Sequence, residues 1–418
     1  MNTAYVLGAG ASHSYVDSHS GTRPPLANDF FSTYIQLPIS EDFEVRVGDV
    51  VNYVRDFYNT SPARFSTFSM NVETFMTELD GKIRFLADKI RLRKLDRKEL
   101  SNFFTWVKAY DQMIFLFAHV INETQRGPVS KQYAKLASMC DKSDVLITFN
   151  WDTLLDRALY ESGTWIPDTG YGVNFRNILD ADWRPPSLQA SSILLLKLHG
   201  SVNWLVNYVT RHMTTGERVM VTGQPTPGKI IISLDPGFSI ENGILQVHPE
   251  LNVRQWGSQP IPGPEEPSAT PCCFLRGPKP FRAYRNRYRF GYQDFGYFFP
   301  PNDPTGDIPM MPLIVPPTNF KLYDEFKHVL DPLWEEAKRR ITDSHRIVII
   351  GYSFPPTDHR VTGLLQPLVS LSSSALTIQV VNPSPETVCQ RIINEIGIKS
   401  ECLRVVARSF DDYLQLEH

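Results

Sequence analysis

The sequence lacks the features that mark membrane proteins and disulfide-linked secreted proteins. Its longest apolar stretch, Met113–Ile121, contains His119 and falls well below the ~20 residues that a membrane-spanning helix needs. The first residues have neither the basic segment nor the long apolar core of a signal peptide. The five cysteines form no CxxC pair, and such an odd, scattered set is typical of reduced thiols rather than of disulfides or a zinc site. We therefore expect a cytoplasmic protein without zinc.

The sequence also lacks a strong charge of either sign. Its formal net charge is −3, which gives no overall attraction to nucleic acids or to anionic membranes. We therefore expect neither direct nucleic-acid binding nor membrane binding. With 418 residues, the chain is long enough to bury one large core together with inserted segments.

What the sequence does contain is an alternation of short β-branched runs with helical segments. Strands separated by helices imply right-handed crossovers and a mainly parallel sheet. We expect an α/β fold with a doubly wound, Rossmann-like sheet. Its strands are predicted at residues 4–7, 145–147, 193–198, 346–350, 377–381 and 402–406.

Two long segments interrupt this alternation. Residues 41–140 carry apolar side chains at three- and four-residue spacing, which predicts a helical insertion. The basic run at 88–98 within it is interpreted as a solvated helix face. Residues 205–311 contain clusters of proline and glycine, which predict a loop- and β-rich insertion. The Rossmann-like core is then expected to comprise residues 1–40, 141–204 and 312–418.

Four short motifs each follow a predicted strand. They are Gly8–Ser12, Thr148–Asp152, His199–Ser201 and Gly351–Phe354. In open α/β sheets, ligands bind outside the carboxyl ends of the strands, along one edge of the sheet. We therefore expect the four motifs to meet at a single site.

The glycine motif fits a turn in which backbone N–H groups approach a pyrophosphate at a helix N-terminus. Gly8, Ala9 and Gly10 would form that turn. His13 stands where the G-x-G-x-x-G fingerprint of dinucleotide-binding proteins has its third glycine. This departure disfavours a dehydrogenase-type site.

Polar side chains in the other motifs are candidates for contact with the ligand. Asn150 and Asp152 follow a strand, although Asp152 could instead cap the helix that begins after it. His199 leaves a buried strand beside Gly200, where a substrate can approach closely. Histidines titrate near neutral pH, which suits acid/base chemistry, and a purely structural hydrogen bond is the alternative role.

The order of these motifs resembles that of the sirtuin family: GAG-x-S, T-x-N-x-D, HGS, G-x-S and a strand that ends in Asn382. Residues 351–358 read G-Y-S-F-P-P-T-D, similar to the G-Y-S-F-P-P-x-D segment of the bacterial sirtuin-like branch of antiphage defence. Within that branch, the chain resembles the stand-alone, HerA-associated type. The resemblance implies an NAD glycohydrolase, which cleaves NAD to nicotinamide and ADP-ribose and depletes NAD in abortive infection.

The resemblance also implies roles around the nicotinamide ribose. Asn150 and Asp152 would surround this ribose, with Asn150 holding the attacking water. His199 would contact the ribose hydroxyls as the general base. The loop at Pro25 would match the mobile segment that covers nicotinamide.

The other half of NAD would lie against the remaining motifs. The resemblance implies that the pyrophosphate is held by the turn after the first strand, and that the adenosine half is held after the strands at 346–350 and 377–381. The residues implied are Gly8, Ala9, Gly10 and Ser12 for the pyrophosphate, and Ser353 and Asn382, beside Gly351, for the adenosine half.

The chain departs from the protein-deacylating sirtuins in two segments. Those enzymes carry four zinc cysteines after the His-Gly motif, whereas this chain has only Cys272 and Cys273 there, too few for a four-thiolate site. Their Phe-Gly-Glu segment, which lines the acyl-lysine cleft, is replaced by residues 312–318. NAD-dependent deacylation or ADP-ribosyl transfer is therefore the alternative activity, and a sensor that binds NAD or ADP-ribose is the non-enzymatic alternative.

An active NAD glycohydrolase is toxic to its host, so its activity has to be controlled. The sequence shows no second effector or sensing domain, and we therefore expect a homo-oligomer, a separate regulatory partner, or both. In the family that the chain resembles, the partner is a HerA-type ATPase or a short Argonaute. Linear and cyclic ADP-ribose both stay open as products.

Overall fold

The structure of the chain is a computed structural model. It describes chiefly residues 2–37, 48–59, 70–92, 96–165, 167–173, 193–207, 310–319, 326–355, 358–371 and 376–416, with short strands between 209 and 246. Among these residues, none of the helices has both the length and the apolar composition needed to cross a membrane.

Six parallel strands form the central sheet, in the order β13-β12-β11-β1-β2-β3. The chain adds β2 and β3 on one side of β1, then returns and adds β11, β12 and β13 on the other side. The strand order thus reverses between β1 and β11, the switch point at which doubly wound sheets bind ligands. The predicted fold class is confirmed. The strands are β1 (Thr3–Leu7), β2 (Val145–Thr148), β3 (Leu194–Lys197), β11 (Arg346–Ile350), β12 (Thr377–Val381) and β13 (Leu403–Val406).

These strands form because their residues can be buried on both faces. Every residue of β1 and β2 is buried, as expected of parallel strands that are covered by helices on both sides. In the edge strand β13, by contrast, Arg404 and Val405 are exposed. The observed strands begin and end within one residue of the predicted ones.

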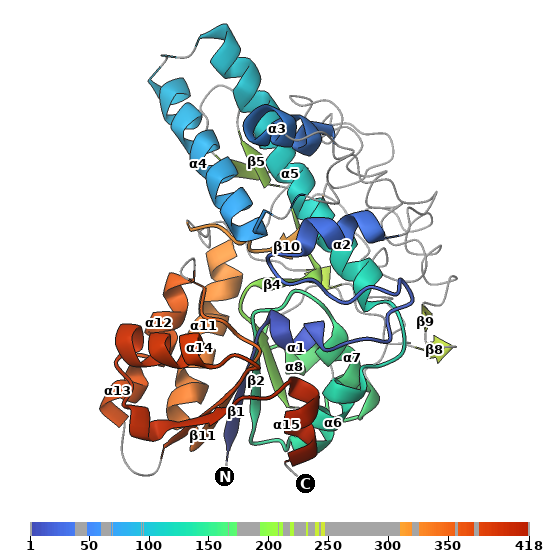
Figure 1. The fold of residues 1–418 in the computed structure, drawn as a ribbon, viewed down its shortest axis with the longest axis vertical. Coiled ribbons are helices and arrows are strands. Elements are labelled where there is room, and N and C mark those ends of the chain that lie inside the picture. Colours follow the sequence, from blue (N-terminus) through green and yellow to red (C-terminus); the bar gives the residue numbers. More distant parts are fainter. Residues whose placement is uncertain are drawn as a thin grey trace, which may run out of the picture.

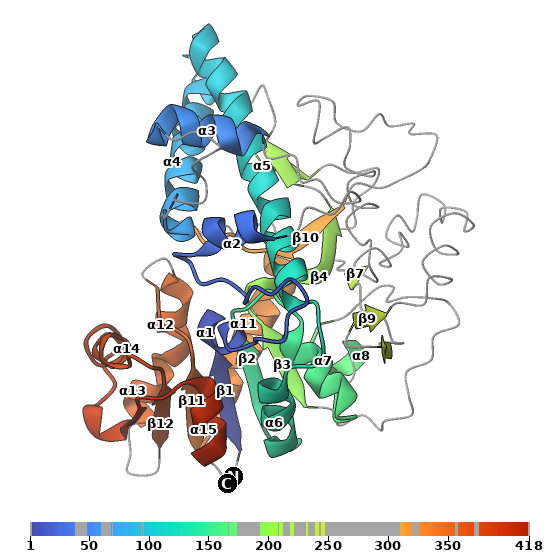
Figure 2. The ribbon, with the colours of Figure 1, turned by 45° about the vertical axis from the view of Figure 1, so that its right-hand side comes forward.

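Helices cover both faces of the sheet (Figures 1 and 2). On one face α6 contacts α7 and α15, and on the other face α11 contacts α12. The predicted helical insertion of residues 41–140 includes α6, which contacts α7 and α15 of the sheet's helical layer, and the domain boundaries stay a prediction. The helices are α6 (Lys131–Met139), α7 (Leu154–Glu161), α15 (Phe410–Leu416), α11 (Lys327–Asp343), α12 (His359–Leu365), α13 (Pro367–Leu371) and α14 (Glu386–Arg391), which a π-helical turn continues to Ile396.

Three helices of the first insertion lie beyond the carboxyl ends of the strands (Figure 1). They are α3 (Gly48–Tyr58), α4 (Val72–Arg91) and α5 (Arg97–Gln125), and α5 contacts both of the others. The apolar spacing read from the sequence corresponds to buried side chains, among them Phe75, Leu79 and Ile83. A short helix that we did not predict, α2 (Phe30–Gln36), also contacts α5.

The basic run at residues 88–98 is not one helix face, and this expectation was wrong. α4 ends at Arg91 and α5 begins at Arg97, so the run spans the turn between two helices. The turn ends in a capping box, in which the Asp96 carboxylate accepts from the backbone N–H of Glu99 and the Glu99 carboxylate accepts from that of Asp96. Carboxylates that cap backbone groups in this way favour a helix start over a continuous helix.

The second insertion begins and ends in paired strands. β4 (Gly200–Asn207) pairs antiparallel with β10 (Met310–Ile314) and with β7 (Ile231–Ile232). Two small ribbons are β5 (Val209–Arg211) with β6 (Arg218–Met220), and β8 (Ser239–Glu241) with β9 (Ile244–Gln246). Cys272 and Cys273 lie outside the described residues.

Candidate active site

The glycine turns that follow β1 and β11 meet at the switch point. The backbone N–H of Gly10 donates to the carbonyl oxygen of Gly351 at 2.9 Å. A Cβ atom added to Gly8 would lie 2.5 Å from the Cα atom of Tyr352, and Gly351 has a φ angle of 62°. Only glycine fits such contacts and such a φ angle without strain. The glycines that we assigned to NAD therefore also hold two strand ends together, directly where α1 (Ala9–His13) begins.

Ser12 joins the first motif to the second. Its hydroxyl donates to Oδ2 of Asp152 at 2.7 Å and accepts from Nδ2 of Asn150 at 2.8 Å. The hydroxyl of Tyr133, on α6, lies 2.9 Å from the same oxygen. A hydroxyl has one proton to donate and two lone pairs, so these three contacts use its full capacity. Ser12 is 2% exposed, and its role in this structure is to orient Asn150.

Asn150 is half-buried and is held from two sides. Its Nδ2 atom donates to the carbonyl oxygen of Gly8 at 2.9 Å, in addition to the bond with Ser12. Its backbone N–H donates to Oγ1 of Thr148 at 3.0 Å. Because both donors of the amide nitrogen are used by Gly8 and Ser12, the amide oxygen is the atom that can accept a hydrogen bond from a water or a ligand hydroxyl.

Asp152 is buried behind Ser12. Burial raises the pKa of its carboxyl group above the ordinary value, and the ammonium group of Lys197 and the hydrogen bond from Ser12 act in the opposite direction. The Oδ1 atom of Asp152 accepts from the backbone N–H of Leu154, the first residue of α7, at 3.0 Å. The N-cap residue of α7 is Thr153, so Asp152 is not the N-cap that we gave as the alternative. It accepts from the first N–H of the helix from one position earlier, together with its contact to Ser12.

A buried ion pair fixes this loop against β3. Nζ of Lys197 lies 3.0 Å from Oδ2 of Asp156 and donates to the backbone oxygen of Asp152 at 2.5 Å. The side chains of the pair are 1% and 0% exposed, and the hydroxyl of Tyr171 also donates to Asp156. Removal of one partner would leave the other charge unpaired in the interior, at a cost of about 3–5 kcal/mol.

His199 is buried among aromatic rings and one carboxylate. Its Nε2 atom is 3.1 Å from Oδ1 of Asp358, and the other carboxylate oxygen accepts from the hydroxyl of Tyr352 at 2.5 Å. The ring of Phe149 meets the imidazole edge to face, with the ring centres 5.0 Å apart. Trp334, on α11, lies 6.2 Å from the imidazole, measured between ring centres.

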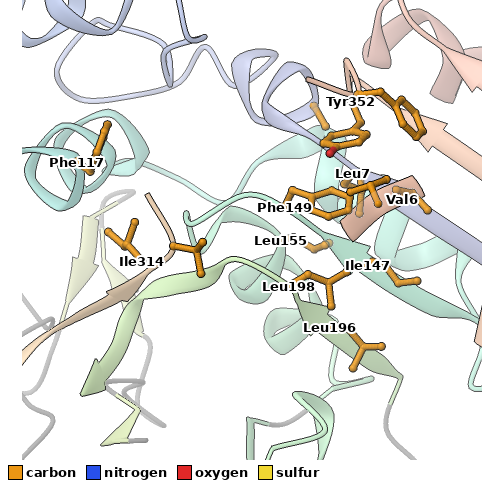
Figure 3. Close-up of a cluster of buried hydrophobic side chains, with 14 of the residues drawn as sticks. Val6, Leu7, Phe117, Ile147, Phe149, Leu155, Leu196, Leu198, Ile314 and Tyr352 are labelled. Atoms are coloured by element: carbon orange, nitrogen blue, oxygen red, sulfur yellow. The ribbon is translucent and has the colours of Figure 1, made fainter. Parts of the chain in front are cut away.

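Phe149 links His199 to the other motifs. Its ring stacks on that of Tyr352 with 4.3 Å between the centres and 19° between the planes (Figure 3). Its backbone N–H donates to the carbonyl oxygen of Leu7 at 3.0 Å, at the end of β1. Because Asn150 is the next residue, the amide and the imidazole are held by the same short segment. The site thus forms where the ends of β1, β2, β3 and β11 meet.

The two residues assigned to the adenosine half lie on the neighbouring strand ends. Ser353 is exposed, and its carbonyl oxygen accepts from the Arg391 guanidinium at 3.1 Å. Asn382 directly follows β12, and its Oδ1 atom accepts from the backbone N–H of Ser384 at 2.9 Å. The backbone N–H of Gly351 donates to the carbonyl oxygen of Val381, which places these two turns side by side.

Pro25 is half-buried in the loop between α1 and α2. The carbonyl oxygen of Pro24, the residue before it, is 2.7 Å from Nδ1 of His13 on α1. His13, which occupies the third position of the glycine fingerprint, therefore ties the loop to the start of the site. The contact of Pro25 with nicotinamide stays a prediction.

The structure adds residues that the sequence analysis missed. Tyr133 contacts Ser12 from a helix 121 positions away, and neither residue carries a motif that would pair them. Asp358 is the last residue of the G-Y-S-F-P-P-T-D segment, yet we had given it no role. Lys197 offered a signal that could have been used, because a lysine inside an apolar strand has to find a buried anion.

Comparison with known proteins assigns no family. No protein-family model and no curated protein matches the chain. Among solved structures, a serine-to-alanine mutant of a Sir2 homologue in complex with ADP-ribose is similar over 99% of this chain and 89% of that chain. The two chains are 11% identical, with a TM-score of 0.31. A similarity this low carries no functional argument, and the function has to be argued from the site itself.

No cluster of three or more histidine, cysteine, aspartate or glutamate side chains suited to a metal ion occurs among the residues that the structure describes. The expected absence of zinc stays a prediction, because the two cysteines of the second insertion lie outside those residues. Elemental analysis of the purified chain would decide it.

Proposed function

We propose that this chain is an NAD glycohydrolase that cleaves NAD to nicotinamide and ADP-ribose. The observation that carries the proposal is the combination of an oriented amide, Asn150, and a carboxylate-paired imidazole, His199, at the switch point of a Rossmann-ordered sheet. The order of sequence motifs, which resembles that of the sirtuins, supports NAD as the substrate.

The proposed reaction breaks the bond between the nicotinamide nitrogen and the anomeric carbon of the ribose. The electron pair of this bond leaves with nicotinamide, and positive charge develops on the ribose as in other glycoside chemistry. The oxygen of a water molecule, held by the amide oxygen of Asn150, then bonds to the anomeric carbon. The proton that this water loses passes to His199, directly or through a ribose hydroxyl, and then to solvent. NAD and water thus give nicotinamide, ADP-ribose and one proton.

The first alternative uses the same first step with a different nucleophile. In deacylation or ADP-ribosyl transfer, an acyl oxygen or a protein side chain would attack the ribose in place of water. The orientation of Asn150 favours hydrolysis, because its amide nitrogen is fixed by Gly8 and Ser12 and its oxygen is suited to hold a water molecule. The same orientation disfavours a sensor that only binds NAD or ADP-ribose, because binding alone needs no water-holding group beside a base.

An assay in water enriched in ¹⁸O distinguishes hydrolysis from deacylation and from binding without turnover. Purified chain, NAD and labelled water should give nicotinamide together with ADP-ribose that carries one ¹⁸O atom at the anomeric position. A matched incubation of ADP-ribose alone corrects for exchange of that oxygen with solvent. Nicotinamide release that requires an acyl-lysine peptide would favour deacylation, and binding of NAD without release would favour a sensor.

The His199→Ala variant provides the residue-level test of this function. Loss of nicotinamide release with an unchanged circular dichroism spectrum is the expected result. The melting temperature should fall, because the buried Asp358 carboxylate loses its partner. Wild-type turnover in the folded variant would exclude His199 as the base.

The biological role and the partners are further parts of this proposal. Depletion of cytoplasmic NAD during antiphage defence would require that the activity is held in check until infection. We propose control by homo-oligomer formation or by a HerA-type ATPase or a short Argonaute. Mass photometry of the chain with and without each candidate partner, followed by the nicotinamide assay, tests this control.

A further inference from the structure

We propose that Asp358 is the positioning residue of His199: its carboxylate keeps the imidazole proton on Nε2 and so makes Nδ1 the atom that accepts the proton in the reaction. This inference rests on the proposed function for its catalytic consequence. The pairing of the two side chains can be tested without any turnover.

The first argument is the hydrogen bond itself. Nε2 of His199 and Oδ1 of Asp358 are 3.1 Å apart, and the two side chains are 6% and 1% exposed. An ionised carboxylate can only accept, so the nitrogen that faces it has to carry a proton. In a neutral imidazole the other nitrogen, Nδ1, is then the basic one.

The second argument is that the carboxylate is itself fixed. Its Oδ2 atom accepts from the hydroxyl of Tyr352 at 2.5 Å. The Tyr352 ring is stacked on Phe149 (Figure 3). Phe149 in turn meets the imidazole of His199 edge to face. Asp358 and Tyr352, which follow β11, and Phe149, which follows β2, thus surround His199. A base that is oriented by a third group in this way is the arrangement found in catalytic triads.

The third argument is that the Asp358 side chain does not cap the helix that begins after it. It occupies the N-cap position of α12, where aspartate ordinarily accepts from the first backbone N–H groups of the helix. Its side chain makes no such bond. The carboxylate instead contacts His199 and Tyr352. Asp358 thus pairs with a residue 159 positions away and does not cap its own helix.

The backbone that brings Asp358 to this place is held in unusual conformations. Gly351 has a φ angle of 62°, and Phe354 has a φ angle of 52°, which is rare for a bulky side chain. The Arg391 guanidinium of α14 donates to the carbonyl oxygens of Ser353 and Phe354 and holds this turn. Left-handed backbone at a residue other than glycine persists only where the surroundings impose it, and such residues cluster at functional sites.

The decisive variant is Asp358→Asn, which keeps the shape of the side chain but removes its charge and can donate to Nε2. The variant should shift the imidazole to the other tautomer. Asp343→Asn is the matched control, because Asp343 is a surface carboxylate on α11 that pairs with Arg339. A Tyr352→Phe variant keeps the ring stacked on Phe149 and removes only the hydroxyl that fixes Asp358.

The first readout is kinetic. We expect Asp358→Asn to lower kcat for nicotinamide release by about 100-fold or more, as for loss of a general base, with the KM for NAD unchanged. Tyr352→Phe should give a smaller loss of kcat, and Asp343→Asn none. An unchanged kcat in folded Asp358→Asn would overturn the proposal. If that variant does not fold, an unchanged kcat in Tyr352→Phe overturns it instead.

The second readout is the ¹⁵N NMR spectrum of the histidine side chains in the ligand-free chain, with the His199 signal assigned from a His199→Gln variant. In the wild type, Nε2 should carry the proton. In Asp358→Asn, the proton should move to Nδ1, because the asparagine amide can donate to Nε2. An unchanged His199 signal would overturn the pairing. If wild-type chain cleaves no NAD alone or with any candidate partner, the proposed function fails, and this spectrum still decides the pairing by itself.

Discussion

At the scale of single residues, Ser12 connects three side chains of the site through hydrogen bonds of its hydroxyl. Its hydroxyl contacts the side chains of Asn150 and Asp152, which follow β2, and of Tyr133 on α6. Each of these groups is fully or partly buried, so each has to find a hydrogen-bonding partner inside the protein. The structure places Ser12 beside Asn150 and Asp152, and its predicted contact with the pyrophosphate of NAD stays a prediction. The hydrogen bonds of its hydroxyl could not be predicted from the sequence, because the partners lie 121 to 140 positions away in the chain.

The Ser12→Ala variant should therefore be both less stable and less active. Loss of the hydroxyl removes the hydrogen bond to Oδ2 of Asp152 and the contact with the Tyr133 hydroxyl, both of which are buried. This should lower the free energy of unfolding by about 1–3 kcal/mol. Nicotinamide release should fall as well, because Asn150 loses one of its two anchors. Ser138→Ala, at an exposed position of α6, is the control and should change neither quantity. Equal stability of the two variants in urea would contradict the role given to Ser12.

At the scale of secondary-structure elements, strands were easier to predict than the contacts between their ends. Short β-branched runs located all six strands of the sheet within one residue, because a parallel strand buried on both faces has to be continuously apolar. The turn between α4 and α5 was missed, although Asp96 and Glu99 form a capping box that the sequence displays. The pairing of His199 with Asp358 could not be predicted, because it depends on the path of a turn with two positive φ angles.

A pair of glycine substitutions tests how tightly the β1 and β11 turns are joined. In Gly8→Ala, the new Cβ atom would lie 2.5 Å from Cα of Tyr352, so the two turns have to separate. We expect a loss of about 1–3 kcal/mol in the free energy of unfolding, as for other overpacked sites, and a loss of activity. In Gly81→Ala, within α4, no heavy atom lies within 4 Å of the new Cβ atom. That variant should gain about 0.5–1 kcal/mol. Denaturation in urea measures both, and equal effects would contradict the close contact.

The long helix α5 contains a buried titratable group. His119 is 4% exposed, and burial lowers its pKa from 6.5 to about 3. Between these values the unfolded chain binds a proton that the folded chain does not bind, so stability rises with pH across this window and is constant above it. Lowering the pH from 7.5 to 5.5 should cost the wild type about 1.4 kcal/mol more than His119→Gln, which has no such group. Urea denaturation at the two pH values checks this, and parallel losses in both proteins would rule it out.

At the scale of the whole molecule, a Rossmann-ordered sheet brings residues from the full length of the chain to one edge. The motifs after β1, β2, β3 and β11 lie between positions 8 and 358, yet hydrogen bonds and ring contacts connect them. The sequence could predict this convergence because all parallel strands end at the same side of the sheet. The sequence could not predict how the helices beyond the strand ends are arranged, because α3, α4 and α5 pack through contacts between residues far apart in the chain.

The most direct test of the central claim is a single-turnover measurement with the full chain in excess over NAD. Products are separated by liquid chromatography after binding of NAD has been verified by calorimetry. We predict that wild-type chain converts bound NAD to equal amounts of nicotinamide and ADP-ribose, and that Asn150→Ala binds NAD but releases no nicotinamide. NAD that stays intact on the wild-type chain both alone and with each candidate partner, or equal release by Asn150→Ala, would contradict the assignment of this site as an NAD glycohydrolase.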